Sequence, residues 1–332
     1  MAREPRIIFK NSLYEIVPRA REGLPLPPTD TTNQLLKGIL ARTQRDDKVT
    51  VCNFVEMNNH SHQHAISNQP DQLSKFYMEY QKKITDSVRK LTRSESLQLW
   101  EGRPSVALLA LAEDAINRLI YMFLNPVKAG LVQSIDDYPG LTTWEAFKTC
   151  EPSVDAQVTV EAYWTPASQL EPLPEHNKLS PASDRAMARS CRENPKTIKY
   201  EMVIKPLAWL ACYGITDPVR IEKIRQRIIK AVYDGESELA KERLQKKIPV
   251  MGAERLKQQA YLKPHTPKAK ERRIFLICGN NKRRPKLIAL FKDIAKKCRE
   301  CYLLLKEGKP HDWPPGTFIP WVPPKICQAV CF

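Results

Sequence analysis

Residues 51–67, VCNFVEMNNHSHQHAIS, decide the fold, because they join an apolar strand to a histidine-rich one through an Asn-Asn turn. His60, His62 and His64 alternate, so in a β-strand all three imidazoles leave the same face. Turn residues between two strands predict an antiparallel hairpin. Imidazole is the commonest metal ligand near neutral pH, so three on one face indicate a metal-type site. The alternative is a polar strand face at the edge of a sheet.

The flanking sequence predicts the remaining elements of an α+β fold. Alternating apolar residues predict a strand over residues 6–18, and Thr and Asp cap residues predict a helix over residues 29–45. A strand over 49–56 precedes the turn, and apolar residues spaced three and four apart predict a long helix over 72–91 and another near 113–124. We therefore expect a small antiparallel sheet with helices on one face.

Composition favours a globular chain. The 332 residues are 42% hydrophobic, enough for a sizeable core, and no apolar run approaches the ~18 residues of a membrane span. The start, MAREPRIIFK, has no apolar signal core, and the nine cysteines have scattered spacings. We expect a cytoplasmic protein with reduced thiols.

The positive charge is concentrated in the second half of the chain. Lys and Arg minus Asp and Glu give 19 − 17 = +2 for residues 1–150 and 34 − 20 = +14 for residues 151–332, within a total of +16. Such an excess indicates a polyanionic partner, because cations that neutralise phosphates release counterions. We expect nucleic acid, DNA or RNA; the alternative is a solvated basic surface.

Three regions follow from these patterns. We expect an α+β domain over residues 1–149, a Pro-rich linker over 150–183, and a basic, mostly helical nucleic-acid-binding region over 184–332. The candidate phosphate contacts lie in two basic loops and one earlier arginine: Lys263, Lys268, Lys270, Arg272, Arg273, Lys282, Arg283, Arg284, Lys286 and Arg103.

Two cysteine pairs have spacings that a zinc site could use. They are Cys298 with Cys301, and Cys327 with Cys331. The first pair lies in a predicted helix, where both thiols can face the core, so we favour packing over zinc.

Several blocks of the first 145 residues together resemble one family. They are MAREPRIIFKNSLYEIVPR, MNNHSHQHAIS, LSKF, LWEGR, YMFLNPVKAGLV and DDYPG, in a consistent order. This series resembles the REP-associated tyrosine transposases, which are HUH single-tyrosine transposases that act on single-stranded DNA.

The resemblance implies a ferredoxin-like fold with His60 and His62 as the paired metal ligands, holding Mg²⁺ or Mn²⁺. It implies a helix-borne tyrosine that attacks a phosphate, forming a 5′-phosphotyrosine and freeing a 3′-hydroxyl. It implies DNA hairpins with single-stranded flanks as targets, and a bacterial, nucleoid-associated protein.

The nucleophile departs from the family pattern, because aligning LSKF and LWEGR places Ile84 at the expected tyrosine of the helix 72–91. Tyr77, with Gln81 one turn later as a metal ligand, and Tyr80 are the candidate displaced nucleophiles, and His64 could supply a third metal ligand. We favour a domesticated, binding-only descendant that acts as a regulator or with a protein partner. An active nuclease and a hydrolase that uses metal-bound water remain alternatives.

Overall fold

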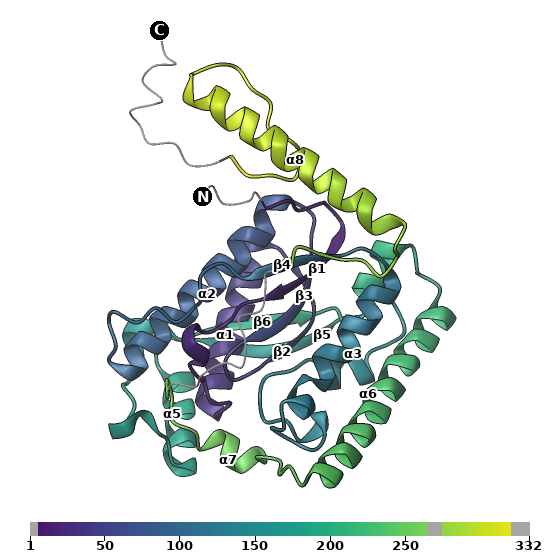
Figure 1. The fold of residues 1–332 in the computed structure, drawn as a ribbon. Helices are drawn as coiled ribbons and strands as arrows, with labels where there is room; N and C mark the ends of the chain where they lie inside the picture. The colour runs from purple at the N-terminus through teal and green to yellow at the C-terminus, as the bar shows by residue number, and fades with distance from the viewer. Residues whose placement is uncertain (1–5, 264–273, 320–332) are drawn as a thin grey trace.

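A seven-stranded mixed sheet runs through the molecule in the order β5-β6-β2-β3-β1-β4-β7 (Figure 1). The computed structural model describes residues 6–263 and 274–319. The strands are β1 (Ser12–Val17), β2 (Thr50–Glu56), β3 (Ser61–Ser67), β4 (Ser105–Leu109), β5 (Val158–Trp164), β6 (Ile198–Ile204) and β7 (Leu276–Ile277). The α-helices are α1 (Asp30–Asp47), α2 (Pro70–Thr92), α3 (Ala112–Lys128), α4 (Trp144–Thr149), α5 (Pro181–Glu193), α6 (Pro218–Lys246), α7 (Ala253–Lys257) and α8 (Arg283–Lys306).

The central strands β2, β3, β1 and β4 pair antiparallel and follow the chain order β1-α1-β2-β3-α2-β4, which is the ferredoxin-like topology. The predicted hairpin is confirmed: β2 pairs with β3, with Phe54 opposite Gln63 and Val55 opposite His62. The predicted α+β class is therefore confirmed.

Helices cover both faces of this sheet. One core joins the apolar stripes of α1 and α2 to alternate residues of the central strands. A second core joins α3, α4 and α6 to the other face. The expected placement of helices on one face therefore holds for α1 and α2 only, since α3 and α6 lie side by side across the sheet from them (Figure 1).

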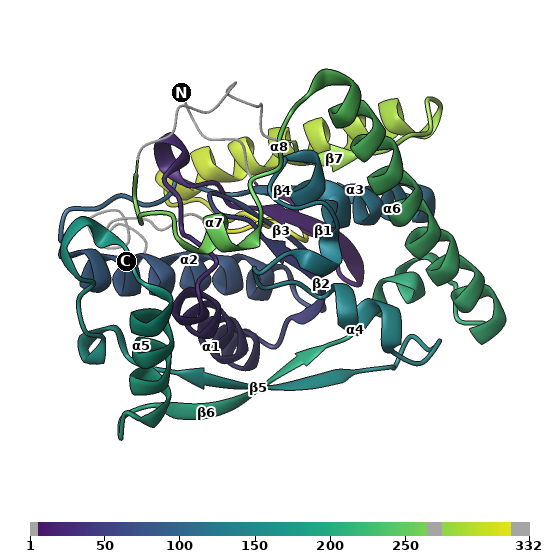
Figure 2. The same ribbon diagram turned by 90° about the horizontal axis from the view of Figure 1, so that it is seen from below.

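The segment expected to be a Pro-rich linker contributes β5, so that expectation is wrong for residues 158–164. β5 pairs antiparallel with β6, and β6 joins the sheet beside β2. Both strands pack against α1 below the main sheet (Figure 2). Gly38 of α1 makes this approach possible, because a Cβ there would lie 2.1 Å from the Tyr163 carbonyl oxygen.

The region expected to be basic and mostly helical contains α5 to α8, but β6 and β7 also join the sheet. Helix α8 packs through Phe291, Ile294 and Cys298 and is otherwise largely exposed. No helix in the described part of the chain is long and apolar enough to cross a bilayer.

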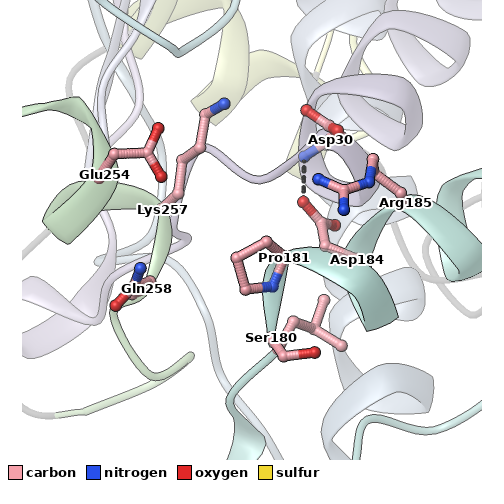
Figure 3. A pocket seen from close by; sticks show the side chains of 9 residues that line it. Asp30, Ser180, Pro181, Asp184, Arg185, Glu254, Lys257 and Gln258 are labelled. Atoms are coloured by element: carbon pink, nitrogen blue, oxygen red, sulfur yellow. Dashed lines mark hydrogen bonds between the residues drawn. The ribbon is translucent and has the colours of Figure 1, made fainter.

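Polar contacts fix the start of α1. The carboxylate of Asp184 accepts hydrogen bonds from the backbone N–H groups of Asp30 (2.7 Å) and Thr31 (2.9 Å), beside a small hollow (Figure 3). Tyr261 shares its hydroxyl with the side chains of Thr29 and Thr32. Residues far along the chain thus cap this helix, where a negative charge is favoured.

Replacing Gly38 should destabilise the fold. In Gly38→Ala the new methyl group meets the backbone of Tyr163, which moves less easily than the end of a side chain. We therefore expect the free energy of unfolding to fall by about 2 kcal/mol in urea titrations. Gly235→Ala in α6 is the matched control, because its methyl group meets only the flexible end of Leu124. Equal stability of the two variants would contradict the close approach of α1 to β5.

Candidate functional site

Two of the three histidines converge on the face that α3 covers. The rings of His60 and His62 meet edge to face with their centroids 5.2 Å apart. The ring of Tyr121 lies 5.6 Å from that of His62, and the amide nitrogen of Asn125 lies 3.4 Å from His60 Nε2. The site thus combines two imidazoles, a phenol and an amide.

Helix α3 supplies the phenol and the amide because Tyr121 and Asn125 are four residues apart and therefore share one face. Pro126 follows Asn125, and Gly130, at φ +71°, adopts the left-handed conformation that ends the helix. Tyr121 is partly exposed, and no described side chain hydrogen-bonds its hydroxyl. The hydroxyl is therefore free to meet a substrate.

Both imidazoles present Nε2 to the site. His60 Nδ1 donates to Asn59 Oδ1 (2.8 Å), and His62 Nδ1 donates to Glu15 Oε1 (3.0 Å). Metal-binding histidines commonly donate their second nitrogen to an oxygen in this way. Two imidazole nitrogens therefore form a donor pair that fits a divalent cation with open positions for a phosphate. Asn125 turns its amide nitrogen toward His60 Nε2, so its amide would have to turn over to present the oxygen as a third donor.

Burial, together with the nearby charges of His62 and Arg19, lowers the pKa of His60 to about 3. His60 is therefore neutral at physiological pH, as a metal ligand must be. No group of three or more His, Cys, Asp or Glu side chains that could hold a metal occurs among residues 6–263 and 274–319.

Glu15 lies behind this site, buried in β1 between apolar neighbours. Burial alone would raise its pKa, but the hydrogen bond from His62 and the positive charge of Arg118 lower it to about 2. Arg118 donates to both carboxylate oxygens, from Nε at 2.9 Å and from Nη2 at 2.8 Å. The ionised carboxylate therefore holds an imidazole of the candidate site and a guanidinium together.

Two cations lie close to the ring of Tyr121. The guanidinium carbon of Arg118 lies 4.5 Å from the ring centroid, and Lys128 Nζ lies 4.7 Å from it. The two side chains come from one turn before and two turns after the tyrosine on α3. A phosphate that reaches this ring therefore enters a positive field.

His64 lies on the same sheet face but deeper, fully buried, and neither ring nitrogen has a hydrogen-bond partner in the described structure. Burial, with the charges of Arg118 and His62, lowers its pKa to about 4 against the opposing effect of Glu15. No ring contact joins His64 to His60 or His62 among the described residues. Its predicted role as third ligand gains no support from this position.

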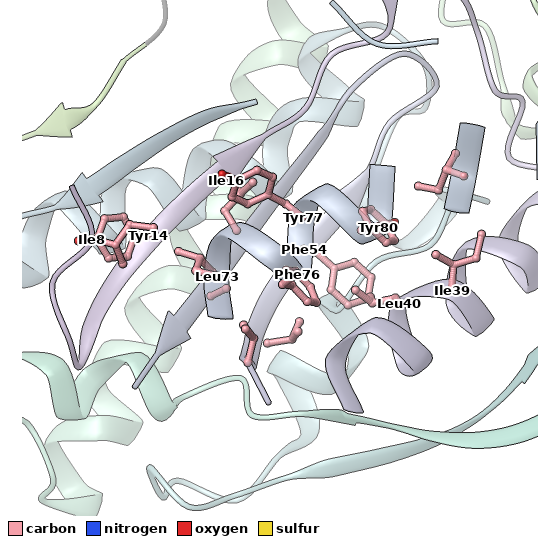
Figure 4. Packing of buried hydrophobic residues seen from close by; sticks show 14 of the residues in the cluster. Ile8, Tyr14, Ile16, Ile39, Leu40, Phe54, Leu73, Phe76, Tyr77 and Tyr80 are labelled. Atoms are coloured by element: carbon pink, nitrogen blue, oxygen red, sulfur yellow. The ribbon is translucent and has the colours of Figure 1, made fainter. Parts of the chain in front are cut away.

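Tyr77 and Tyr80 of α2, the expected nucleophiles, pack with Phe54 and Phe76 in the apolar core that α1 and α2 form with the sheet (Figure 4). That core lies on the face of the sheet opposite the histidines. Tyr80 is buried and donates to Glu56 Oε1 (2.9 Å), which also accepts from Gln63 Nε2 (2.7 Å). Gln63 lies between His62 and His64 in β3 and therefore points to the other face. Burial and the charge of Glu56 raise the pKa of Tyr80, so its hydroxyl is a poor nucleophile.

The other residues predicted for an α2 site make local contacts. Tyr77 is buried, and its hydroxyl donates to Ser74 Oγ at 3.2 Å. The Gln81 side chain points to the carbonyl oxygen of Gly102, 3.5 Å away, and not to a histidine. Ile84 packs in the same apolar core.

The predicted phosphate contacts fall in two groups. Lys282, Arg283, Arg284 and Lys286 are exposed around the start of α8, and Lys263 and Arg103 lie in surface loops. Lys268, Lys270, Arg272 and Arg273 lie outside the described residues.

Of the four cysteines weighed as zinc ligands, two lie among the described residues. Cys298 and Cys301 are buried on the packed face of α8, and Cys301 Sγ lies 3.1 Å from the Asp312 carbonyl oxygen. Cys327 and Cys331 lie outside the described residues.

Sequence reasoning missed Tyr121, Asn125, Glu15 and Arg118. The signal for the first two was present in YMFLN, because a tyrosine and an amide four residues apart is the same spacing that was used to propose Tyr77 and Gln81. The signal for Glu15 was one acidic residue inside the apolar strand SLYEIV.

Comparisons with known proteins give limited information. No family model matches the chain, and no curated protein matches it. One solved structure, of a REP-associated tyrosine transposase bound to a REP hairpin, is similar at 17% sequence identity and a TM-score of 0.34. The similarity covers 44% of this chain and 84% of that chain. At this TM-score it carries no argument about function.

Glu56 should make stability fall as pH rises. Burial raises its pKa to about 7 in the folded protein, against 4.5 as its ordinary value. Between pH 4.5 and pH 7 the Glu56 carboxyl group therefore keeps its proton in the folded state but loses it in the unfolded state. The free energy of unfolding should fall by about 3 kcal/mol as pH rises through this range. We expect Glu56→Gln to be more stable than the wild type at pH 8 by up to that amount, and equally stable at pH 4, in urea unfolding. A constant difference across this range would contradict the assignment.

Proposed function

We propose that this protein cleaves single-stranded DNA beside a hairpin, with Tyr121 as the nucleophile and with His60, His62 and Asn125 holding a divalent metal ion. The observation that carries the proposal is the convergence of Tyr121 and Asn125 on the His60–His62 pair. The hairpin substrate comes from the sequence resemblance described above.

The cleavage step begins with Tyr121. Tyr121 Oη attacks phosphorus, an Oη–P bond forms, and the bond from phosphorus to the 3′ oxygen breaks. The leaving 3′ oxygen takes a proton from water, and the phenolic proton passes to solvent, because no described side chain accepts it. The product is a 5′-phosphotyrosine and a free 3′-hydroxyl.

Neutral His60, and His62 held by Glu15, offer their Nε2 atoms on the side where the phosphate would lie. A bound Mg²⁺ or Mn²⁺ would draw negative charge from the non-bridging oxygens of that phosphate. Arg118 and Lys128, which lie 4.5 Å and 4.7 Å from the centre of the tyrosine ring, would bind the same phosphate.

An adduct assay tests the proposal. Wild-type protein incubated with Mn²⁺ and labelled hairpin DNA carrying single-stranded flanks should form a covalent complex on a denaturing gel. Tyr121→Phe should abolish the complex because it removes only the attacking oxygen, and His60→Ala should reduce it at least about tenfold by weakening metal binding.

Tyr80→Phe is the matched control, since Tyr80 is a buried tyrosine on the other face of the sheet. It should retain the adduct. Cleavage without an adduct would assign the reaction to metal-bound water, and binding without cleavage would assign a recognition protein. Either outcome would contradict Tyr121 as a nucleophile.

The exposed start of α8 is the second part of the proposal, as a surface that binds the DNA backbone. Lys282, Arg283, Arg284 and Lys286 are all exposed, and α8 has no acidic residue in its first turn. Changing all four to Gln should lower the slope of log affinity against log salt by about 2–4, because fewer counterions are released.

Four cations of similar exposure serve as the control, since each already pairs with an acidic side chain: Lys199, Arg227, Lys230 and Lys246. Changing these to Gln removes the same formal charge. If both quadruple variants alter the salt slope equally, the effect comes from net charge and the α8 surface is excluded.

A further inference from the structure

Glu15 is the one buried carboxylate that contacts the candidate site, among the described residues. It lies in β1, directly opposite His64 in the pairing of β1 with β3, and its side chain is 3% exposed. It accepts from His62 Nδ1 and from two nitrogens of Arg118. An isolated buried carboxylate would be strongly unfavourable, so these partners account for its presence in an apolar strand.

The contact with Arg118 leaves part of the guanidinium available. Nε and Nη2 point to Glu15, whereas Nη1 has no hydrogen-bond acceptor among the described residues. The Arg118 side chain is 24% exposed, and its guanidinium lies over the Tyr121 ring. A long, flexible side chain is thus held in one orientation beside the proposed nucleophile.

We propose that Glu15 is a positioning residue that sets the imidazole of His62 and the guanidinium of Arg118 together, and that Arg118 binds the phosphate attacked by Tyr121. This inference rests on the proposed function and adds the residue that orients both the phosphate-binding Arg118 and the imidazole of His62. In this arrangement one carboxylate fixes both the metal-binding tautomer of His62 and the direction of Nη1.

The arrangement separates two effects that can be measured independently. Loss of the Glu15 charge weakens the hold on His62, so the affinity for Mn²⁺ should fall about tenfold. It also releases Arg118, so the single-turnover cleavage rate at saturating Mn²⁺ should fall about 100-fold. Loss of Arg118 itself should lower that rate by a similar factor while the Mn²⁺ affinity changes less than about threefold.

A double-mutant cycle tests this coupling. Glu15→Gln, Arg118→Gln and the double variant are compared with the wild type for Mn²⁺ affinity by calorimetry and for cleavage rate at saturating Mn²⁺. If Glu15 acts on the rate through Arg118, the double variant should be as slow as Arg118→Gln within about threefold. Independent effects would multiply to about 10⁴-fold and would overturn the proposal, as would wild-type rates in either single variant.

Glu56→Gln is the matched control, because Glu56 is a buried glutamate in the neighbouring sheet region but faces α2. It should leave both the Mn²⁺ affinity and the rate unchanged. If Glu15→Gln does not fold, Arg118→Gln still tests the phosphate contact, because Arg118 is partly exposed.

The readouts also distinguish this inference from the proposed function. A wild-type protein that forms no adduct would contradict the nuclease, yet the tenfold loss of Mn²⁺ affinity in Glu15→Gln would still support positioning of His62. An adduct in the wild type with unchanged Mn²⁺ affinity and rate in Glu15→Gln would contradict the positioning role alone.

Discussion

The two-residue period of β3 is the constraint on which the site depends. It places His62 and His64 on one face of the sheet and Gln63 on the other. His60 directly precedes β3, and its ring meets that of His62. Side chains that contact the histidines therefore come from that face: Glu15 from the neighbouring strand β1, and Tyr121 and Asn125 from α3. The tyrosines of α2 pack against the opposite face.

Two buried glutamates on opposite faces of this sheet show how neighbouring groups determine whether a buried carboxyl group is ionised. Glu15 meets an imidazole and a guanidinium, so its pKa falls to about 2 and it remains ionised. Glu56 meets only neutral hydrogen-bond donors, so burial prevails and its pKa rises to about 7. One face therefore carries a fixed negative charge next to the imidazoles, whereas the other carries a carboxyl group that titrates near neutral pH.

The sequence allowed the hairpin and the helices α1, α2 and α3 to be predicted, because each has a clear apolar period or cap. The sequence does not reveal β5, because prolines surround it. Its pairing with β6, and the pairing of β6 with β2, also join residues that are far apart in the chain. The sequence could not show that Tyr77 and Tyr80 face away from the histidines. Their apolar stripe predicts a buried helix face but not the side of the sheet on which that helix lies. The sheet face that a helix covers is set by how the chain connects the strands before and after the helix. The local spacing of apolar residues does not contain this information.

The most direct measurement is the identity of the peptide that carries the DNA after reaction. Trypsin should release Tyr121 in the peptide of residues 119–128, LIYMFLNPVK, and both α2 tyrosines in that of residues 76–82, FYMEYQK. Mass spectrometry of the digested adduct formed with Mn²⁺ should find the phosphonucleotide on the first peptide. Modification of the second peptide, or of neither, would contradict the account.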